Sequence, residues 1–385
     1  MKVKQNELAS TLNAHNCQAY VIYDTTANSD MRYLTSFSTR DPILYIHYAD
    51  NKRELIVPEM EVARARHETD LTVISRNELE YHKIFAELGD SHKTIARIIQ
   101  QRCLGNIMIP KSMPAALAFS LCDNQSQKVV IDFEKSIEWM RNIKSEKELG
   151  YIAASAQATE NAMSYAISLI KTAIVKDGML YHAETGDLLT SELLRYEIHN
   201  TLLKQGFHAE DTIVGCGLNT AMPHWAGTGA FHANQPIIID IFPSSDTTGY
   251  CADMTRTVSK GAPAQKISDM HAAVLHALHL AQNMVKPGMS TRDMHQAVLD
   301  YFTEHGFETA GQSGFIHSLG HGVGLSVHEF PSLSLLDMPL QENQVIAIEP
   351  ALYYADVGGV RIENMGIVTD TGFTSFTSYP EVLIV

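Results

Sequence analysis

One strand-like apolar run, residues 236–243, carries a carboxylate, Asp240, in its interior. A second carboxylate, Asp253, follows the cluster of turn-forming residues 244–249. If the segment folds as a hairpin about Asp246 and its successor, Asp240 and Asp253 become directly opposed, with Cβ atoms about 5 Å apart on one face. Two buried carboxylates that close cannot both stay ionised without a cation between them. The segment therefore predicts a metal-binding hairpin.

The C-terminal part of the chain repeats this arrangement. Glu349 directly follows the apolar residues 345–348, and Glu363 directly follows residues 358–362, which begin with two glycines. A turn about Asp356 would place the two glutamates opposite each other. This second hairpin predicts two more carboxylates at the same site.

A glycine-rich stretch, residues 320–325 (GHGVGL), lies between the two hairpins and is followed by His328. We expect its glycines to let the backbone approach the site closely and to hold His321 in a sharp bend. Four carboxylates and one imidazole form a mixed oxygen and nitrogen donor set that Mn, Co, Fe or Zn accept. Two bridging carboxylates suit a pair of ions about 3.5–4 Å apart, an arrangement that activates water for hydrolysis.

Each of these elements also has an ordinary interpretation when it is taken alone. An aspartate at a strand end is commonly a turn or cap residue, and an acid after an apolar strand is commonly ion-paired at the surface. A single histidine is commonly a hydrogen-bonded polar residue, and the chain has 18 of them. The glycine-rich stretch lacks the Lys-Ser/Thr ending of a phosphate loop and the pattern of a dinucleotide site. The joint occurrence of both hairpins and the histidine favours the metal site.

At these positions the chain resembles the pita-bread metallopeptidases, the superfamily of aminopeptidase P, prolidase and methionine aminopeptidase. The matching strings are IDIF, GYCADMTRT, HSLGHGVGLSVHE, IEPALYY and GGVRIEN. The loop between the first two aspartates is longer than in the commonest prolidases, a difference at the hairpin tip that leaves the ligands in place and concerns only the rim of the site. The resemblance implies five metal ligands for two divalent ions: Asp240, Asp253, His321, Glu349 and Glu363.

The resemblance also implies a role for each ligand. Asp240 would bind one ion through both oxygens, Asp253 and Glu363 would bridge the pair, and His321 and Glu349 would complete the second ion. Mn²⁺ is the metal that we expect, with Co²⁺, Zn²⁺ or Fe²⁺ as alternatives that this mixed donor set also accepts.

Four further residues have positions that match catalytic and substrate-binding groups of these enzymes, and structural hydrogen bonding is the alternative for each. In addition to these four, the ligand Glu349 would take the proton of the attacking water and deliver it to the leaving nitrogen. His317 and His328 would donate to the substrate carbonyl or the developing oxyanion. Arg361 would orient Glu363 and keep it ionised. His224, upstream of the first aspartate, would contact the substrate.

The activity that the resemblance implies is hydrolysis of the Xaa-Pro bond at a peptide N-terminus by a metal-bridging hydroxide, in an enzyme of the aminopeptidase P or prolidase type. The long segment before the ligands argues against methionine aminopeptidase, and the complete ligand set argues against creatinase. The alternatives are a hydrolase of the same fold that acts on a non-proline or non-peptide C–N bond, and a non-catalytic binding protein.

The pattern along the chain predicts two domains. Residues 1–140 alternate strand-like runs with helical stretches, an α/β pattern, and residues 136–147 are expected to form a charged connector. Ser145 and Glu148 form a capping-box signature before a long helical stretch at 149–173. Further helices are expected near three segments: 188–205, 265–285 and 290–305. With the resemblance, the fold class is α+β: a creatinase-N-like α/β domain (1–140), then a pita-bread catalytic domain (141–385) with a curved antiparallel sheet and outer helices.

Composition narrows the partners and the compartment. A formal net charge of −15 argues against nucleic acid as a partner. No run approaches the ~20 apolar residues of a membrane span, and the polar start of the chain predicts no signal peptide. Five scattered cysteines indicate free thiols in a reducing, cytoplasmic compartment. The resemblance adds the expectation of a homodimer or a larger homo-oligomer.

Overall fold

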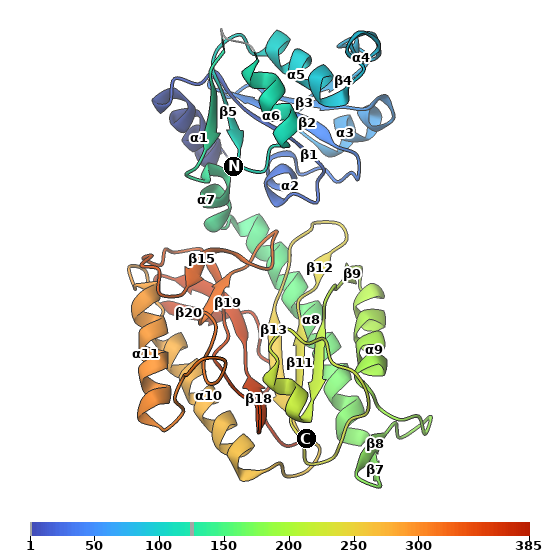
Figure 1. Cartoon of the computed structure of the whole chain (residues 1–385), viewed down its shortest axis with the longest axis vertical. Coiled ribbons are helices and arrows are strands. Elements are labelled where there is room, and N and C mark those ends of the chain that lie inside the picture. The colour runs from blue at the N-terminus through green and yellow to red at the C-terminus, as the bar shows by residue number, and fades with distance from the viewer. Residues whose placement is uncertain (1, 124–126) are drawn as a thin grey trace. The chain divides into compact units, whose positions relative to one another are not determined.

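The structure is a computed structural model that describes residues 2–123 and 127–385. The chain divides into two compact units, Met1–Arg141 and Asn142–Val385 (Figure 1).

The first unit is built on a six-stranded mixed sheet with strand order β4-β3-β2-β1-β5-β6. β1, β2 and β3 pair antiparallel, whereas β4, β5 and β6 pair parallel to their neighbours. The strands are β1 (Ala19–Asp24), β2 (Ile43–Tyr48), β3 (Arg53–Val57), β4 (Thr72–Ser75), β5 (Ile107–Pro110) and β6 (Val129–Asp132).

Helices cover both faces of this sheet because side chains alternate along its strands. Val21 of β1 belongs to a core formed with α4, α5 and α6, and Ile22 belongs to a second core formed with α1, α2, α3 and α7. The helices are α1 (Lys2–Ala14), α2 (Ser29–Thr35), α3 (Val62–Glu68), α4 (Tyr81–Leu88), α5 (Ser91–Arg102), α6 (Ala115–Cys122) and α7 (Ser136–Asn142), and the short 3₁₀ helix η1 (Glu59–Glu61) precedes α3. The predicted α/β pattern is confirmed in this unit.

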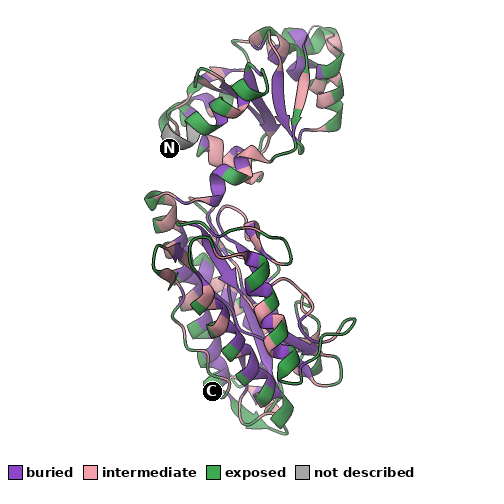
Figure 2. Ribbon diagram, turned by 90° about the vertical axis from the view of Figure 1, so that its left-hand side faces the viewer, coloured by how far each residue is buried: buried purple, intermediate pink, exposed green. Residues whose placement is uncertain are grey.

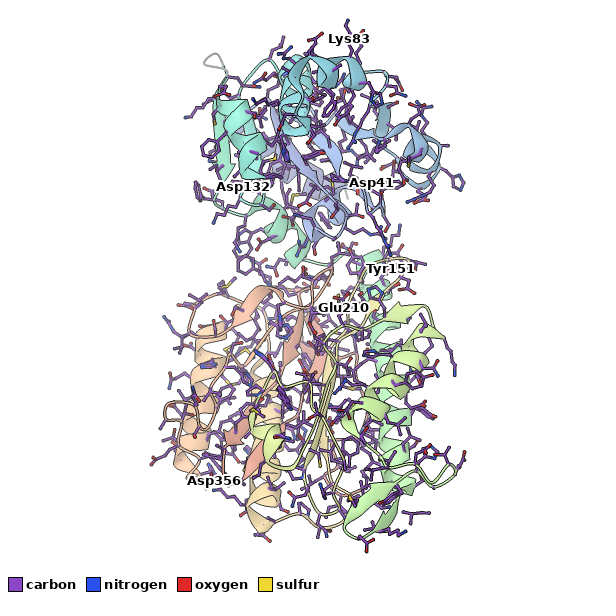
Figure 3. All side chains as sticks on the ribbon, turned by 45° about the vertical axis from the view of Figure 1, so that its right-hand side comes forward. Asp41, Lys83, Asp132, Tyr151, Glu210 and Asp356 are labelled. Carbon is purple, nitrogen blue, oxygen red and sulfur yellow. The ribbon has the colours of Figure 1, made fainter. Side chains whose placement is uncertain are left out.

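The prediction of a charged connector over residues 136–147 is wrong for its first half, where α7 forms. Asp132 accepts hydrogen bonds from the backbone N–H of Ser136 (2.9 Å) and from its hydroxyl (3.1 Å), at the first residue of α7 (Asp132 is labelled in Figure 3). Ile137 and Met140, at helical spacing, are buried in the second core. A connector was predicted because charged residues lie between these apolar positions, so the amphipathic helical pattern of the segment was overlooked.

The second unit combines four helices with antiparallel sheets, and the predicted helices at 149–173, 188–205, 265–285 and 290–305 are confirmed. The helices are α8 (Glu146–Thr172), α9 (Ser191–Leu203), α10 (Gln265–Met284) and α11 (Thr291–Glu304), with the 3₁₀ helix η2 (Gly217–Ala221). Figure 2 shows buried strands behind helices whose outer faces are exposed.

Strands of two sheets, with orders β10-β11-β13 and β15-β14-β16-β19-β20, contain or directly adjoin the five predicted metal ligands. Two-stranded pairs β7–β8, β9–β12 and β17–β18 complete the unit. The strands are β7 (Ile174–Lys176), β8 (Met179–Tyr181), β9 (Phe207–His208), β10 (Ile213–Cys216), β11 (Ile237–Ile241), β12 (Ser244–Ser245), β13 (Met254–Val258), β14 (Gly320–Gly322), β15 (Glu329–Leu333), β16 (Val345–Ile348), β17 (Ala351–Tyr354), β18 (Gly358–Arg361), β19 (Asn364–Thr369) and β20 (Gly372–Ser375).

Alternation along β11 directs Asp240 away from the helices. Ile237, Ile239 and Ile241 pack in a core with α8 and α9. Ile238, on the opposite face, packs with Ala351 and Tyr353. Asp240 shares the face of Ile238, so the helices bury one side of the strand and leave the carboxylate on the inner side.

Within the described residues, none of the helices is both long enough and apolar enough to cross a membrane.

The predicted capping box at the start of α8 is confirmed. Glu148 accepts a hydrogen bond from the backbone N–H of Ser145 at 2.8 Å, and the Ser145 hydroxyl accepts from the backbone N–H of Glu148 at 3.4 Å. These bonds satisfy two of the N–H groups that a helix start leaves without a partner.

Ser145→Ala should lower the free energy of unfolding by about 1 kcal/mol, because it removes the cap of α8. Thermal and urea unfolding followed by circular dichroism would measure the change. Ser168→Ala is the matched control, because its exposed hydroxyl bonds only to the carbonyl of Tyr165 within the same helix. Equal stability of the two variants would contradict the cap's contribution.

Candidate metal centre

The first acidic hairpin has a different register from the predicted one. β11 and β13 pair antiparallel with Asp240 opposite Thr255, so the predicted direct opposition of Asp240 and Asp253 is wrong. The intervening chain does not form a simple turn about Asp246. It forms β12, which pairs with the distant strand β9, and the register of β11 with β13 differs accordingly from the predicted one. Asp253 lies two residues before Thr255 and therefore falls on the same face as Asp240, diagonally rather than directly across.

The second acidic hairpin has the predicted register. β16 pairs with β19 through Ile348 and Asn364, and β17 pairs with β18 through Ala351 and Arg361 with the same offset. Glu349 and Glu363 lie between these two ladders and stand opposite each other, as predicted. The hairpin turns at Asp356, which Figure 3 labels.

His321 lies in a strand rather than in the predicted sharp bend. β14 pairs with β15 on one side and with β16 on the other. A Cβ atom at Gly320 would lie 2.0 Å from the carbonyl oxygen of Ala347, and one at Gly322 would lie 2.0 Å from that of Phe330. The glycines therefore permit the close approach of neighbouring strands, whereas the sequence predicted a close approach of the backbone to the site and a sharp bend.

The His321 ring presents an unprotonated nitrogen to three carboxylates. Its Nδ1 lies 3.1 Å from the carbonyl oxygen of Gly322, which can only accept, so Nδ1 carries the proton and Nε2 carries a lone pair. Nε2 lies 3.7 Å from Asp253, 3.6 Å from Glu349 and 3.8 Å from Glu363. Burial lowers the pKa of His321 to about 3, so the ring stays neutral. Four electron-rich groups thus converge on one point, an arrangement that a cation would stabilise.

The carboxylates of this cluster have buried oxygens that lack partners. Among the described residues, no hydrogen-bond partner is found for Asp240 Oδ1, Asp253 Oδ1 or Glu363 Oε1. Burial, and then repulsion from Glu363, raise the pKa values of Asp253 and Glu349 well above the ordinary range. Burial and the charge of Asp240 raise the pKa of Glu363 to about 7.

The donor set fits a divalent metal. Asp253, His321 and Glu363 each offer one ligand atom, and these atoms lie within 4.8 Å of one another. Glu349 adjoins the same histidine, and Asp240 offers its unpaired Oδ1 from the neighbouring strand. Buried carboxylates with unpaired oxygens and a neutral imidazole are the ligands that Mn²⁺, Fe²⁺, Co²⁺ or Zn²⁺ require.

Arg361 binds Asp240 directly and acts on Glu363, the predicted carboxylate, at longer range. Its Nη2 donates to Asp240 Oδ2 at 2.6 Å, and its charge opposes the rise in the pKa of Glu363. Arg361 reaches Glu363 through Thr255: its Nε donates to the Thr255 hydroxyl at 3.2 Å, and that hydroxyl donates to Glu363 Oε2 at 2.8 Å. Thr255 was missed in the sequence analysis. It could have been found, because residues two apart in a strand lie on the same face and Thr255 is two residues after Asp253.

Tyr353 extends this hydrogen-bond chain to His317 and was also missed. Arg361 Nη1 donates to the Tyr353 hydroxyl at 2.7 Å. His317 Nδ1 donates to the carbonyl oxygen of Ser318 at 2.7 Å, so its Nε2 accepts from Tyr353 at 3.2 Å. Burial, reinforced by Arg361, lowers the pKa of His317 to about 4. His317 Nε2 is therefore an acceptor in this arrangement and not the predicted donor.

His328 and His224 lie on the open side of the cluster, and both are exposed. The His328 ring packs edge-on against the His321 ring, with centroids 4.1 Å apart. Burial lowers the pKa of His328, the charge of Asp240 opposes the shift, and His224 adds to it. The structure thus brings all of the predicted site residues to one region, and these two histidines are its exposed members.

Comparisons with known proteins agree with this geometry. The pattern of metallopeptidase family M24 matches residues 150–370, and that of the creatinase/prolidase N-terminal domain matches residues 5–143. The Xaa-Pro dipeptidase of Pyrococcus horikoshii is 30% identical over 342 residues, which are 88% of each chain.

Solved structures of full-length relatives superpose well. A prolidase from Pyrococcus horikoshii matches with a TM-score of 0.83 and 25% identity over 99% of each chain. An X-Pro aminopeptidase from Thermotoga maritima matches with a TM-score of 0.78 and 25% identity, over 95% of this chain and 97% of the other. The predicted α+β fold, a creatinase-N-like unit followed by a pita-bread unit, is confirmed.

Metal affinity should rise with pH between about 6 and 8. Because burial and mutual repulsion raise the pKa values of Asp253, Glu349 and Glu363, the last to about 7, the metal-free site binds protons that a metal must displace. Each proton released adds about one unit of log K per pH unit.

Isothermal titration of the metal-stripped protein with Mn²⁺, in buffers of different ionisation enthalpy, would measure both affinity and proton release. Glu363→Gln should lower the number of protons released. A pH-independent affinity without proton release would show that the carboxylates are already ionised in the metal-free protein.

Proposed function

The chain belongs to metallopeptidase family M24, and we propose that it is a dinuclear metallo-exopeptidase that hydrolyses the Xaa-Pro bond at a peptide N-terminus. The observation that carries this proposal is the convergence of the His321 Nε2 lone pair and three carboxylates on one point. The full-length similarity to proteins described as an Xaa-Pro dipeptidase and an X-Pro aminopeptidase supports the choice of substrate.

We assign the five ligands as the resemblance implies. Asp240, Asp253, His321, Glu349 and Glu363 would together hold the two metal ions, with Asp253 and Glu363 shared between them. When bound, the pair supplies a water that is ionised at neutral pH and an electrophile for the scissile carbonyl. We place this catalytic domain at residues 141–385 and the accessory domain at residues 1–140, in agreement with the two compact units.

Glu349 is the residue that moves the proton. Its side chain is 16% exposed, the highest among the three carboxylates around His321, so it adjoins the space where substrate enters. Its raised pKa lets it hold a proton between abstraction from water and delivery to the leaving nitrogen.

The histidines divide into two groups. His328 and His224 are exposed beside the cluster, and we propose that they contact the carbonyl group and the backbone of the substrate. His317 accepts from Tyr353, which accepts from Arg361, so we assign His317 to fixing the guanidinium on Asp240 when no substrate is bound. A rotation of the Tyr353 hydroxyl would be needed before His317 could contact a substrate.

The metal, the assembly and the compartment are further proposals. An oxygen-rich donor set with one imidazole supports Mn²⁺, and metal analysis of the purified protein tests this. A homodimer rests on the resemblance and is tested by sedimentation. All five cysteines are free, which supports a reducing, cytoplasmic compartment.

Turnover on proline peptides should depend on added metal. After metal stripping and repletion with Mn²⁺ or Co²⁺, release of the N-terminal amino acid from Ala-Pro, Ala-Pro-Ala and a longer Xaa-Pro peptide would be measured, with Ala-Ala as the control. Cleavage of dipeptides alone would indicate a prolidase, and cleavage of longer peptides would indicate an aminopeptidase P.

No cleavage of any of these peptides with both metals bound would overturn the proposed specificity. It would favour the alternatives of a different C–N substrate or a binding function on the same fold.

Variants should separate metal ligands from substrate contacts. Asp240→Ala and Glu363→Ala should lose metal and activity together, because each removes a ligand. His328→Ala should keep both metals and lose about 10²–10⁴-fold in kcat, the range for a missing acid–base or oxyanion group. Inductively coupled plasma mass spectrometry beside steady-state kinetics would measure both. Metal loss in His328→Ala would show that this histidine is itself a ligand.

A further inference from the structure

A buried ion pair lies outside the ligand set, between the first residues of the second unit and the loop that carries His328. Lys144 donates through Nζ to Glu329 Oε1, and the two side chains are 1% and 4% exposed. The Lys144 Nζ also lies 3.4 Å from the carbonyl oxygen of Asn142, and its backbone N–H donates to the carbonyl oxygen of Asn343 at 2.8 Å. Burying two charges has a desolvation penalty that an apolar pair of similar volume would avoid, so stability alone does not account for this pair.

Glu329 occupies the base of a tight hairpin. It pairs with Gly322 where β15 leaves β14, and the next residue towards the loop is His328. A Cβ atom at Gly324 would lie 2.2 Å from Glu329 Oε1 and 2.9 Å from Oε2. The carboxylate is therefore in contact with both the Lys144 ammonium and the backbone of the loop at Gly324.

We propose that Lys144 is a positioning residue for His328. By fixing the Glu329 carboxylate, it sets where the loop between β14 and β15 places the neighbouring imidazole relative to His321, whose ring lies 4.1 Å away. This inference rests on the proposed role of His328, and it concerns a residue outside the metal ligands and their hydrogen-bond partners. A misplacement of about 1 Å in such a group is enough to lower a rate by up to about 10²-fold.

The competing explanation is that Lys144 only neutralises the charge of Glu329. In that case, removing both charges together restores the enzyme, because no unpaired buried charge remains. If Lys144 positions the loop, the double variant recovers stability but not rate, since the tether is still missing.

The experiment compares Lys144→Met, Lys144→Arg, Glu329→Gln and the double variant Lys144→Met/Glu329→Gln with the wild-type holoenzyme. The matched control is Lys260→Met, at a partly buried lysine whose Nζ donates to the carbonyl oxygen of Lys171. We measure kcat, KM, metal content and melting temperature. Lys144→Met is expected to lower kcat about 10- to 10²-fold, with KM within about twofold and metal content unchanged. Lys144→Arg should recover most of the rate, and the control should match wild type.

Hydrogen–deuterium exchange supplies a readout that does not depend on turnover. Exchange across residues 323–329 should accelerate in Lys144→Met and in the double variant, but not in Lys144→Arg, whereas residues 237–241 of β11 should stay unchanged. If wild type hydrolyses no peptide, the proposed function fails and this exchange result alone decides the role of Lys144. If Lys144→Met does not fold, exchange and kcat of the double variant are compared with those of wild type instead.

Unchanged exchange in residues 323–329 would overturn the proposal, as would full recovery of kcat in the double variant. Loss of metal from folded Lys144→Met would overturn it as well, because the effect would then act through the metal centre and not through His328.

Discussion

The second unit contains buried carboxylates that repel one another around the His321 lone pair, and the rest of its structure must offset that repulsion. Asp253, Glu349 and Glu363 lie 3.6–3.8 Å from His321 Nε2, and none of them can donate a hydrogen bond to it while ionised. Such a cluster is unfavourable without positive charge. The antiparallel strands hold the acids together because their own packing against the outer helices stabilises the fold from the opposite face.

Two buried arginines fix the positions of the backbone and side chains of this cluster. Arg361 joins Asp240 to Glu363 by way of Thr255. Arg256, among the most fully buried large side chains, donates to the carbonyl oxygens of Thr255 (2.8 Å) and Glu363 (2.6 Å). Burial lowers the pKa of Arg256 to about 10, which still leaves it charged at neutral pH. One guanidinium thus orients the carboxylates, and the other fixes the peptide groups that carry them, so ligand geometry is set before any ion arrives.

Sequence reasoning succeeded where local pattern decides the structure and failed where distant segments do. Glu349 and Glu363 were placed correctly because a single turn at Asp356 sets the register of the whole hairpin. The register at Asp253 was wrong because β12 pairs with β9, which lies far upstream in the chain. The bend at His321 was wrong because its flanking glycines respond to the neighbouring strands β15 and β16, which no local pattern reveals. The proposed ligands could be named from residue type and order alone, whereas hydrogen-bond partners such as Tyr353 needed the three-dimensional fold.

The two ends of the carboxylate cluster are electrostatically unequal. Asp240 shares its charge with Arg361, whose guanidinium is 2.6 Å away, whereas Glu349 and Asp253 face a neutral imidazole. Burial, and then the charge of Glu363, raise the pKa of Glu349, and the charge of Arg361 opposes that rise without cancelling it. Arg361 thus pairs directly with Asp240, whereas Glu349 keeps the raised pKa that lets it carry a proton.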